Sequence, residues 1–423
     1  MYKKLIYNLG SKGLVFISQF IALILTNHII GPAGRGILVA SITWSSTIFI
    51  MFHFSLATGI LNLSNKNSDR IHALAYLSTF AALLLGIISI IFGLILYFTI
   101  PSLFNNLSLK YIALVFATIP FMMLQQYSMA VVQVKGNFKA FNILYSAYGI
   151  INLAGVSIVW LVHQTSIDLL IYINLSAWFF TGCIAFFYLF PNFKNRQGSN
   201  SIVKQFAKIS LSAHFGSIVS FAVSRSDILI VNYFCNEKQT GVYGFTVGIV
   251  QILLIIPLSI QNLLYHSLLG KEKEEQKKIL LQNSRLTFSL MIVAAIIVFL
   301  LKRPLVNLVG GKGFEAAEPL FKYFLPAIVF YSIPMVLATQ WNILGIFRQI
   351  NFTAIIVFVI SLASNILLVP IIGITGGAIT FLSIAIISFG IHIWFVQKQF
   401  GNTSLKDVLL LKSTDISELF RVK

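Results

Sequence analysis

Two charged residues and a row of polar side chains lie inside the apolar stretch 205–269. The charges are Arg225 and Asp227. Charged side chains at bilayer depth are costly, so they usually mark a transport pathway or a buried ion pair. At about 100° per residue, one face of a helix through this stretch carries Ser210, His214, Ser217, Ser220, Ser224, Arg225 and Asp227. We therefore predict a membrane helix with one polar face and one apolar face.

This polar face has the chemistry needed to bind a phosphorylated sugar. A guanidinium matches the geometry of phosphate oxygens by bidentate hydrogen bonding, and hydroxyl groups bind sugars. Asp227 is the candidate group for coupling transport to a proton or cation, and a structural ion pair of Arg225 with Asp227 is the alternative. No catalytic residue, cofactor or metal site is predicted. The predicted substrate-binding residues are Arg225, Ser217, Ser220, Ser224, His214, Arg35 and His53.

The composition excludes a soluble protein. The chain is 57% hydrophobic and 10% charged, with a mean hydropathy of +0.88. Runs of about 20 apolar residues, enough to cross the hydrocarbon core of a bilayer, recur along the whole chain. We expect an all-α membrane protein with about twelve transmembrane helices, near residues 10–30, 36–61, 72–100, 111–133, 141–162, 168–190, 208–234, 241–268, 285–303, 320–344, 350–370 and 374–397.

The positive charge of the chain predicts its orientation in the membrane. The net charge is +18. Most lysines and arginines fall in alternate loops on one predicted side, the pattern of the positive-inside rule. This places both termini in the cytoplasm. The basic charge is thus explained by topology and by anionic membrane lipids, and we expect no nucleic-acid partner.

Matching segments indicate an internal duplication. Asn27–Gly36 and Asn232–Gly241 each end one span with asparagine and begin the next with glycine, and Gly136–Asn142 matches Gly345–Asn351 at nearly the same separation. Parallel repeats of this kind place the substrate between two like-oriented halves. The predicted parts are an N-lobe at 1–190, a cytoplasmic linker at 191–204, a C-lobe at 205–399 and a cytoplasmic tail at 400–423. The amphiphilic tail is expected to lie along the membrane surface.

Four stretches carry a resemblance to a known family. They are Ile30–Ile37, Asp227–Ile230 followed by Thr240–Tyr243, Val306–Ala317 and Leu368–Ala378. In this order they resemble the Wzx-type polysaccharide flippases of the MOP superfamily, which also contains the MATE drug exporters and the lipid II flippases.

The resemblance implies a V-shaped bundle of two six-helix lobes in the bacterial inner membrane. It also implies export of undecaprenyl-pyrophosphate-linked oligosaccharide units, of O antigen or a similar polymer, by alternating access. The implied partners are this lipid-linked glycan, membrane lipids, and the polymerase and chain-length regulator of the same pathway. The first span lacks the arginine that lipid II flippases carry there, so their pyrophosphate site is not transferred to this chain.

Three other functions remain as alternatives. A MATE-like cation-coupled exporter of small molecules would favour acidic groups in its cavity, whereas Asp227 is the one acid placed within a predicted span. An acyltransferase is suggested by His163 and Asp168, which have a histidine–aspartate spacing used for general base catalysis. A polysaccharide polymerase or ligase would need a long outer loop, and none is predicted.

Overall fold

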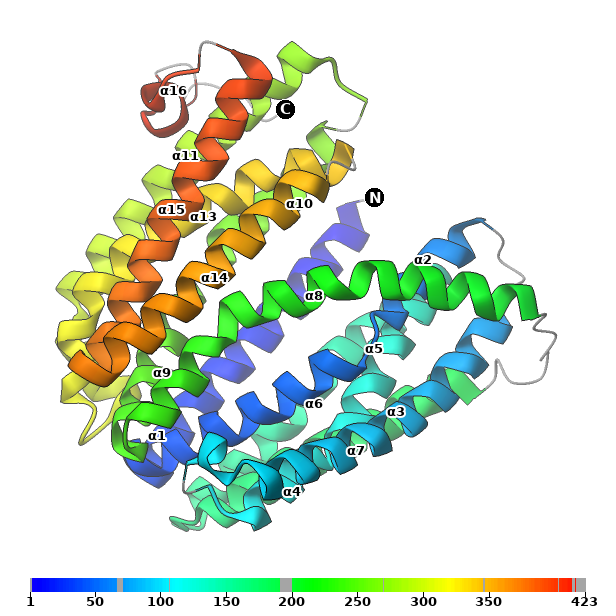
Figure 1. Cartoon of the computed structure of the whole chain (residues 1–423), viewed down its shortest axis with the longest axis vertical. Coiled ribbons are helices and arrows are strands. Elements are labelled where there is room, and N and C mark those ends of the chain that lie inside the picture. Colours follow the sequence, from blue (N-terminus) through cyan, green and yellow to red (C-terminus); the bar gives the residue numbers. More distant parts are fainter. Residues whose placement is uncertain are drawn as a thin grey trace. The chain divides into compact units, whose positions relative to one another are not determined.

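The computed structural model describes residues 2–66, 71–105, 107–190, 200–268, 270–344, 347–401, 403–412 and 415. These residues form helices and connecting turns, with no strand among them (Figure 1). Eleven helices of this part are long and apolar enough to cross a membrane. The first, Gly13–Phe52, has 40 residues and kinks at Gly31, whose φ of 61° is not helical. Since 40 residues of helix would measure about 60 Å, twice the hydrocarbon thickness, this helix comprises two spans, and the prediction of about twelve is confirmed.

The helices follow the predicted spans closely. The first eight are α1 (Tyr2–Phe52), α2 (Leu56–Lys66), α3 (Ile71–Thr99), α4 (Leu109–Phe116), α5 (Ile119–Val134), α6 (Phe138–Leu161), α7 (Ile167–Leu189) and α8 (Asn200–Phe234). The others are α9 (Glu237–Leu253), α10 (Ile255–Leu268), α11 (Lys273–Leu300), α12 (Lys302–Leu305), α13 (Phe321–Leu344), α14 (Phe347–Ile372), α15 (Ile374–Phe400) and α16 (Leu405–Leu409).

The second span of each predicted half is interrupted. In the first half the chain leaves the helix between α1 and α2, at residues 53–55, and in the second half it does so between α9 and α10, at Leu254. Discontinuous helices in membranes are tolerated where other groups satisfy the freed backbone. Transporters with internal repeats often place binding sites at such breaks.

The chain forms two compact units. The first comprises residues 1–241 with 309–311, and the second comprises 242–308 with 312–423. Within the first unit α8 packs along α1 and α2 (Figure 1). The division into an N-lobe and a C-lobe at residue 205 stays a prediction. Residues 191–199 of the predicted linker lie outside the described residues.

The matching segments Asn27–Gly36 and Asn232–Gly241 contact each other within the first unit. We call them the first and the second corner. Gly36 and Gly241 end the matching segments, and a Cβ on Gly36 would lie 1.9 Å from the Glu237 carbonyl oxygen. A Cβ on Gly241 would lie 1.8 Å from the Pro32 carbonyl oxygen. Only residues without a side chain allow the two backbones to approach this closely. The contact of equivalent positions agrees with the duplication predicted from the sequence.

Two asparagine side chains bind the corners to segments of the opposite half. The Asn27 amide donates to the Val309 carbonyl, at 3.1 Å, so the first corner is bound by the segment after α12. The Asn105 amide, in the segment after α3, donates to the carbonyls of Asn232 and Cys235 at the other corner. Each corner is therefore bound by the segment that follows the third span of the opposite half. Gly345, which belongs to the other matching pair, lies outside the described residues.

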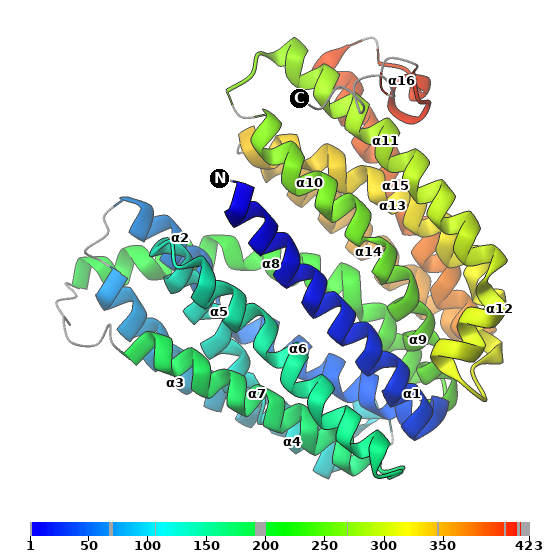
Figure 2. The same cartoon turned by 180° about the vertical axis from the view of Figure 1, so that it is seen from behind.

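Each unit has its own apolar core. In the first, Trp44 of α1 stacks on Phe104 at 4.4 Å, and the buried Ile48 and Met123 belong to the same cluster. In the second, α11, α13 and α15 lie side by side (Figure 2), and Trp341 is buried among them. These cores fix the helices that carry the polar side chains described below.

The described part of the tail packs on a helix of the second unit, and its predicted place on the membrane surface stays a prediction. The α16 helix packs on α11, and the Val408 side chain is fully buried. The Arg285 guanidinium of α11 donates two hydrogen bonds of 2.6 Å to the Asp415 carboxylate and a third to the Asp407 carbonyl. The described part of the tail is therefore anchored to the second unit by a buried ion pair, which amphiphilicity alone could not predict.

Candidate functional site

A strained turn interrupts the helix after Phe52. Phe54 and Ser55 have φ values of 45° and 50°, a region that residues other than glycine rarely adopt. His53 and Ser55 in this turn are 3% and 2% exposed, and the Tyr127 hydroxyl of α5 donates to the His53 carbonyl at 2.8 Å. We call residues 53–55 the helix break. Strain of this kind persists only where surrounding contacts hold it, and it is common at functional sites.

The α8 helix covers the helix break with polar side chains. The Nε2 atom of His214 lies 3.0 Å from the Met51 carbonyl oxygen. The hydroxyls of Ser55 and Ser217 are also 3.0 Å apart. The His53 and His214 rings contact each other, with their centroids 5.2 Å apart. The structure thus brings together His53, His214 and Ser217, three of the predicted site residues.

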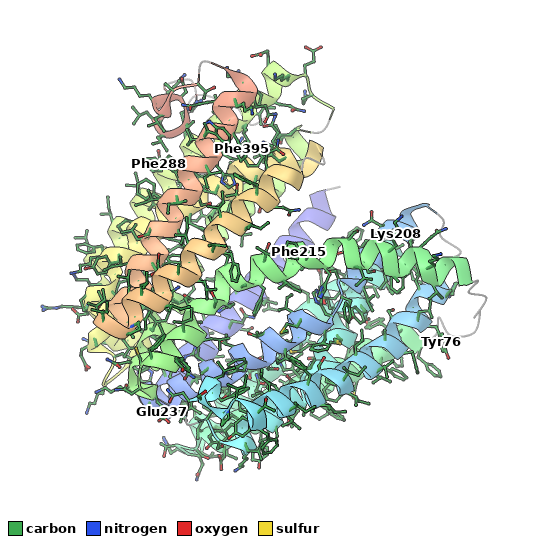
Figure 3. The ribbon with its side chains drawn as sticks, in the orientation of Figure 1. Tyr76, Lys208, Phe215, Glu237, Phe288 and Phe395 are labelled. Atoms are coloured by element: carbon green, nitrogen blue, oxygen red, sulfur yellow. The ribbon has the colours of Figure 1, made fainter. Side chains whose placement is uncertain are left out.

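The polar side chains of α8 differ in their exposure. Ser210 and His214 are buried toward the start of the helix, and Ile228 and Val231 are buried toward its end. Between them Ser220 and Ser224 are exposed, and the Ser224 hydroxyl donates to the Phe221 carbonyl of the same helix. Exposed apolar side chains such as Phe215 and the exposed Lys208 lie elsewhere on α8 (Figure 3). Two hydroxyls of the predicted stripe are thus accessible in the middle of a span.

Arg225 directly follows Ser224 in the sequence, and Asp227 lies two residues further on. Arg225 is half-buried and forms no ion pair with any residue that the structure describes, Asp227 included. Asp227 is 8% exposed, and its carboxylate accepts a hydrogen bond from the backbone N–H of Ile228 at 2.8 Å. The proposed structural pair of Arg225 with Asp227 is therefore absent from this conformation. An arginine without a carboxylate partner is available to bind an anion.

Arg35 lies away from the helix break. It follows the kink at Gly31. Arg35 precedes His53 by 18 residues, which corresponds to about 27 Å along a helix. Its Nε atom is buried and has no hydrogen-bond partner among the described residues. The Tyr148 phenol of α6 lies within electrostatic range of its guanidinium. Arg35 therefore belongs to a second polar cluster of the first unit.

This second cluster has an aromatic surface. Tyr148 stacks on Trp178 of α7 with ring centroids 4.3 Å apart. The Asn174 amide donates to the Tyr148 hydroxyl at 2.8 Å. These residues were not predicted as site residues, although an asparagine and a tryptophan within one apolar span are a sequence signal for such a cluster.

The outer-loop aspartate of the acyltransferase alternative has another partner. The Lys110 ammonium lies 2.6 Å from the Asp168 carboxylate. The described residues also contain no group of three or more histidine, cysteine, aspartate or glutamate side chains that could hold a metal ion. Most of the predicted site residues thus lie at the helix break or in the middle of α8.

Comparison with known proteins rests on structure. No protein-family model matches the sequence, and no curated protein matches it. Among solved structures, the chain is similar to the lipid II flippase MurJ in an inward closed conformation, with a TM-score of 0.77, 14% identity, and coverage of 99% of this chain and 92% of that one. The chain has the fold of the MOP-superfamily transporters. This confirms the predicted fold class.

Two other MOP-fold structures show the same likeness. One is a multidrug resistance MATE family transporter in an inward-facing conformation, with a TM-score of 0.71, 12% identity, and coverage of 95% of this chain and 96% of that one. The other is a MOP-superfamily transporter from Pyrococcus furiosus, with a TM-score of 0.56, 11% identity, and coverage of 92% and 93%. At these identities the likeness establishes the MOP fold and does not by itself assign a substrate.

The sequence missed the groups that hold the helix break in this MOP fold. Ser55 and Tyr127 form two of its hydrogen bonds, and neither was predicted as a site residue. Ser55 could have been found from its position two residues after His53 in an otherwise apolar run. Nothing in the local sequence indicates that Tyr127, on α5, reaches the carbonyl of His53.

Proposed function

We propose that this chain is a flippase that moves an undecaprenyl-pyrophosphate-linked oligosaccharide from the cytoplasmic to the periplasmic leaflet of the bacterial inner membrane by alternating access. The cargo would be an O-antigen unit or the unit of a similar polymer. The polymerase and chain-length regulator of the same pathway would be its protein partners, and both termini would lie in the cytoplasm.

The observation that supports this proposal most directly is that Arg225 forms no ion pair with a described residue. Within a membrane span of a MOP fold, its guanidinium has no ion-pair partner among the described residues, and the exposed Ser220 and Ser224 precede it on the same helix. A pyrophosphate diester has about two negative charges, which a guanidinium binds by bidentate hydrogen bonds. The hydroxyls suit the attached sugars. An exporter of cations would instead favour an accessible carboxylate, and Asp227 is buried.

The membrane potential is sufficient to drive this export. Moving one elementary charge across the membrane is worth about 2.3 kcal/mol per 100 mV. An anionic head group leaving an inside-negative cell is favoured by this amount for each charge. The proposal therefore requires no hydrolysis of a nucleotide.

Replacing Arg225 is expected to abolish surface polysaccharide without reducing the amount of protein. The test is complementation of a strain that lacks its own flippase, with polymer and membrane protein measured together. Arg225→Ala should fail to restore the polymer, and Arg225→Lys should restore it partly, because lysine keeps the charge and loses the bidentate geometry. Lys208→Ala, an exposed site on the same helix (Figure 3), is the matched control and should behave as the wild type. Full activity of Arg225→Ala would refute the role of this residue.

A further inference from the structure

Two histidines are buried in contact with each other inside a membrane span. His53 of the helix break and His214 of α8 are 3% and 7% exposed, and their ring centroids are 5.2 Å apart. We call them the histidine pair. They come from segments far apart in the chain, so their contact depends on α8 lying against the helix break.

The hydrogen bonds of the pair fix where its protons are. A carbonyl oxygen only accepts hydrogen bonds. The Nδ1 atom of His53, 3.0 Å from the Ile50 carbonyl oxygen, must therefore bear a hydrogen. By the same argument, the Nε2 atom of His214 bears a hydrogen that it donates to the Met51 carbonyl. Each neutral ring has then used its one donor, and each retains one lone pair.

The remaining lone pairs are those of His53 Nε2 and His214 Nδ1. The His214 Nδ1 atom is buried and has no hydrogen-bond partner among the described residues. A buried acceptor without a partner is destabilising, so it is retained at the expense of stability. An imidazole lone pair binds either a metal ion or a proton. We consider a proton as the ligand, because each neutral ring of the pair keeps one lone pair that a proton can occupy.

The groups around the pair offer no negative charge to balance a proton. From α5, the Tyr127 hydroxyl contacts the break through the His53 carbonyl. From α3, Phe92 contacts Phe52. The nearest titratable side chain of that helix, Tyr97, lies five residues from Phe92, about 8 Å along it, and its neutral hydroxyl donates to the Leu107 carbonyl. Tyr76 and His72 lie 16 and 20 residues from Phe92. The segment of α1 between Arg35 and the break contains no charged residue, and α2 contains none before Lys66.

On α8 the charged residues also lie at a distance. Lys208 is exposed and precedes His214 by six residues, Arg225 follows His214 by eleven, and Asp227 follows it by thirteen, about 20 Å along the helix. A proton bound at the pair would thus be an uncompensated buried charge in this arrangement. Burial without a partner opposes the charged form, so protonation favours an arrangement in which α8 no longer covers the helix break.

We propose that the histidine pair is the proton-binding site that couples transport to proton movement. In the neutral form, both imidazoles donate to carbonyls at the end of α1, and Ser217 bonds to Ser55, which holds α8 on the helix break. A proton from water adds to one free lone pair and forms an imidazolium. The contact of the rings then opposes a second proton by like-charge repulsion. One proton thereby releases α8 from the helix break.

This inference rests on the proposed transport function for its purpose, but its test needs no substrate. The full chain is placed in lipid nanodiscs and examined by hydrogen exchange and by NMR of ¹⁵N-labelled histidine. His53→Gln and His214→Gln are the informative variants, because a glutamine amide still donates to a carbonyl and takes up no proton near neutral pH. His163→Gln, at an exposed outer turn, is the matched control.

Acidification from about pH 8 to about pH 5 is expected to expose the helix break. Exchange of the backbone amides of residues 53–60, corrected for the intrinsic effect of pH, should rise by roughly tenfold in the wild type and in His163→Gln, which corresponds to linkage of about one pKa unit. It should stay unchanged in the His53→Gln/His214→Gln double variant. In the NMR titration, both rings of the pair should respond to one shared proton.

Three results would overturn the inference. They are an equal rise of exchange in the double variant, no rise in the wild type, and a pair that stays neutral throughout the titration. Each of them would leave the flippase proposal standing, because no lipid-linked sugar is present. Conversely, a protein that transports no such lipid would still show the protonation of the pair.

Discussion

Replacing Gly241 by alanine will prevent the chain from forming its first compact unit. The new Cβ would lie 1.8 Å from the Pro32 carbonyl oxygen and 2.8 Å from the Gly36 nitrogen. Both obstacles are backbone atoms, which cannot turn aside as a side chain can. Overpacking of a core costs about 1–3 kcal/mol, and we expect a larger loss here. The measurement is the yield and thermal midpoint of the purified variant in detergent.

Gly36→Ala should behave in the same way, since its Cβ would overlap the Glu237 carbonyl oxygen. Gly149→Ala is the matched control, because the nearest atom to its Cβ is 3.9 Å away and alanine favours a helix. Normal yield and an unchanged midpoint for Gly241→Ala would show that the two corners do not approach as closely as described.

Removing the Arg285 side chain will destabilise the second unit by about 3–5 kcal/mol, the usual cost of breaking a buried ion pair. Arg285 and Asp415 are 6% and 5% exposed at their side chains, so Arg285→Ala leaves a buried carboxylate without its partner. The apolar double variant Arg285→Met/Asp415→Leu should recover most of the loss, because it removes both charges. A double-mutant cycle of thermal unfolding measures the coupling.

The same ion pair predicts a dependence of stability on pH. The hydrogen bonds from Arg285 hold the pKa of the Asp415 carboxyl below its ordinary value. The stabilisation is thus complete above about pH 4, the ordinary pKa of aspartate, and is lost as the pH falls through the lowered pKa. Asp415→Asn should remove this part of the acid sensitivity, and Lys110→Ala, in an exposed ion pair, should leave it unchanged. Equal acid sensitivity of Asp415→Asn and the wild type would contradict the account.

The spans could be predicted from the sequence because crossing a bilayer imposes length and hydropathy on each helix. The predicted spans 72–100 and 168–190 match Ile71–Thr99 and Ile167–Leu189 within a residue at each end. The equivalent places of Gly36 and Gly241 in matching segments could also be recognised from the sequence, and the duplication they indicate stays a prediction. Both features depend on residues that are close together in the sequence.

The partners of individual side chains could not be predicted in this way. Helical periodicity placed His214, Ser217, Ser220 and Ser224 on one face, yet only the first two contact the helix break. What separates them is the packing of α8 on α1 and α2, which depends on contacts distant in sequence. For the same reason the ion pair of Asp415 with Arg285 could not be predicted from the sequence around either residue.

The central claim, that the chain moves a lipid-linked anionic sugar, is tested most directly by transport in proteoliposomes. The cargo is an undecaprenyl-pyrophosphate-linked oligosaccharide, and its arrival in the opposite leaflet is followed with a membrane-impermeant glycosidase. We predict that the wild-type protein accelerates this movement, that a membrane potential negative on the side of origin increases it, and that Arg225→Ala abolishes it. Failure with every such lipid, together with export of a cationic dye, would contradict the account and favour a MATE-like exporter.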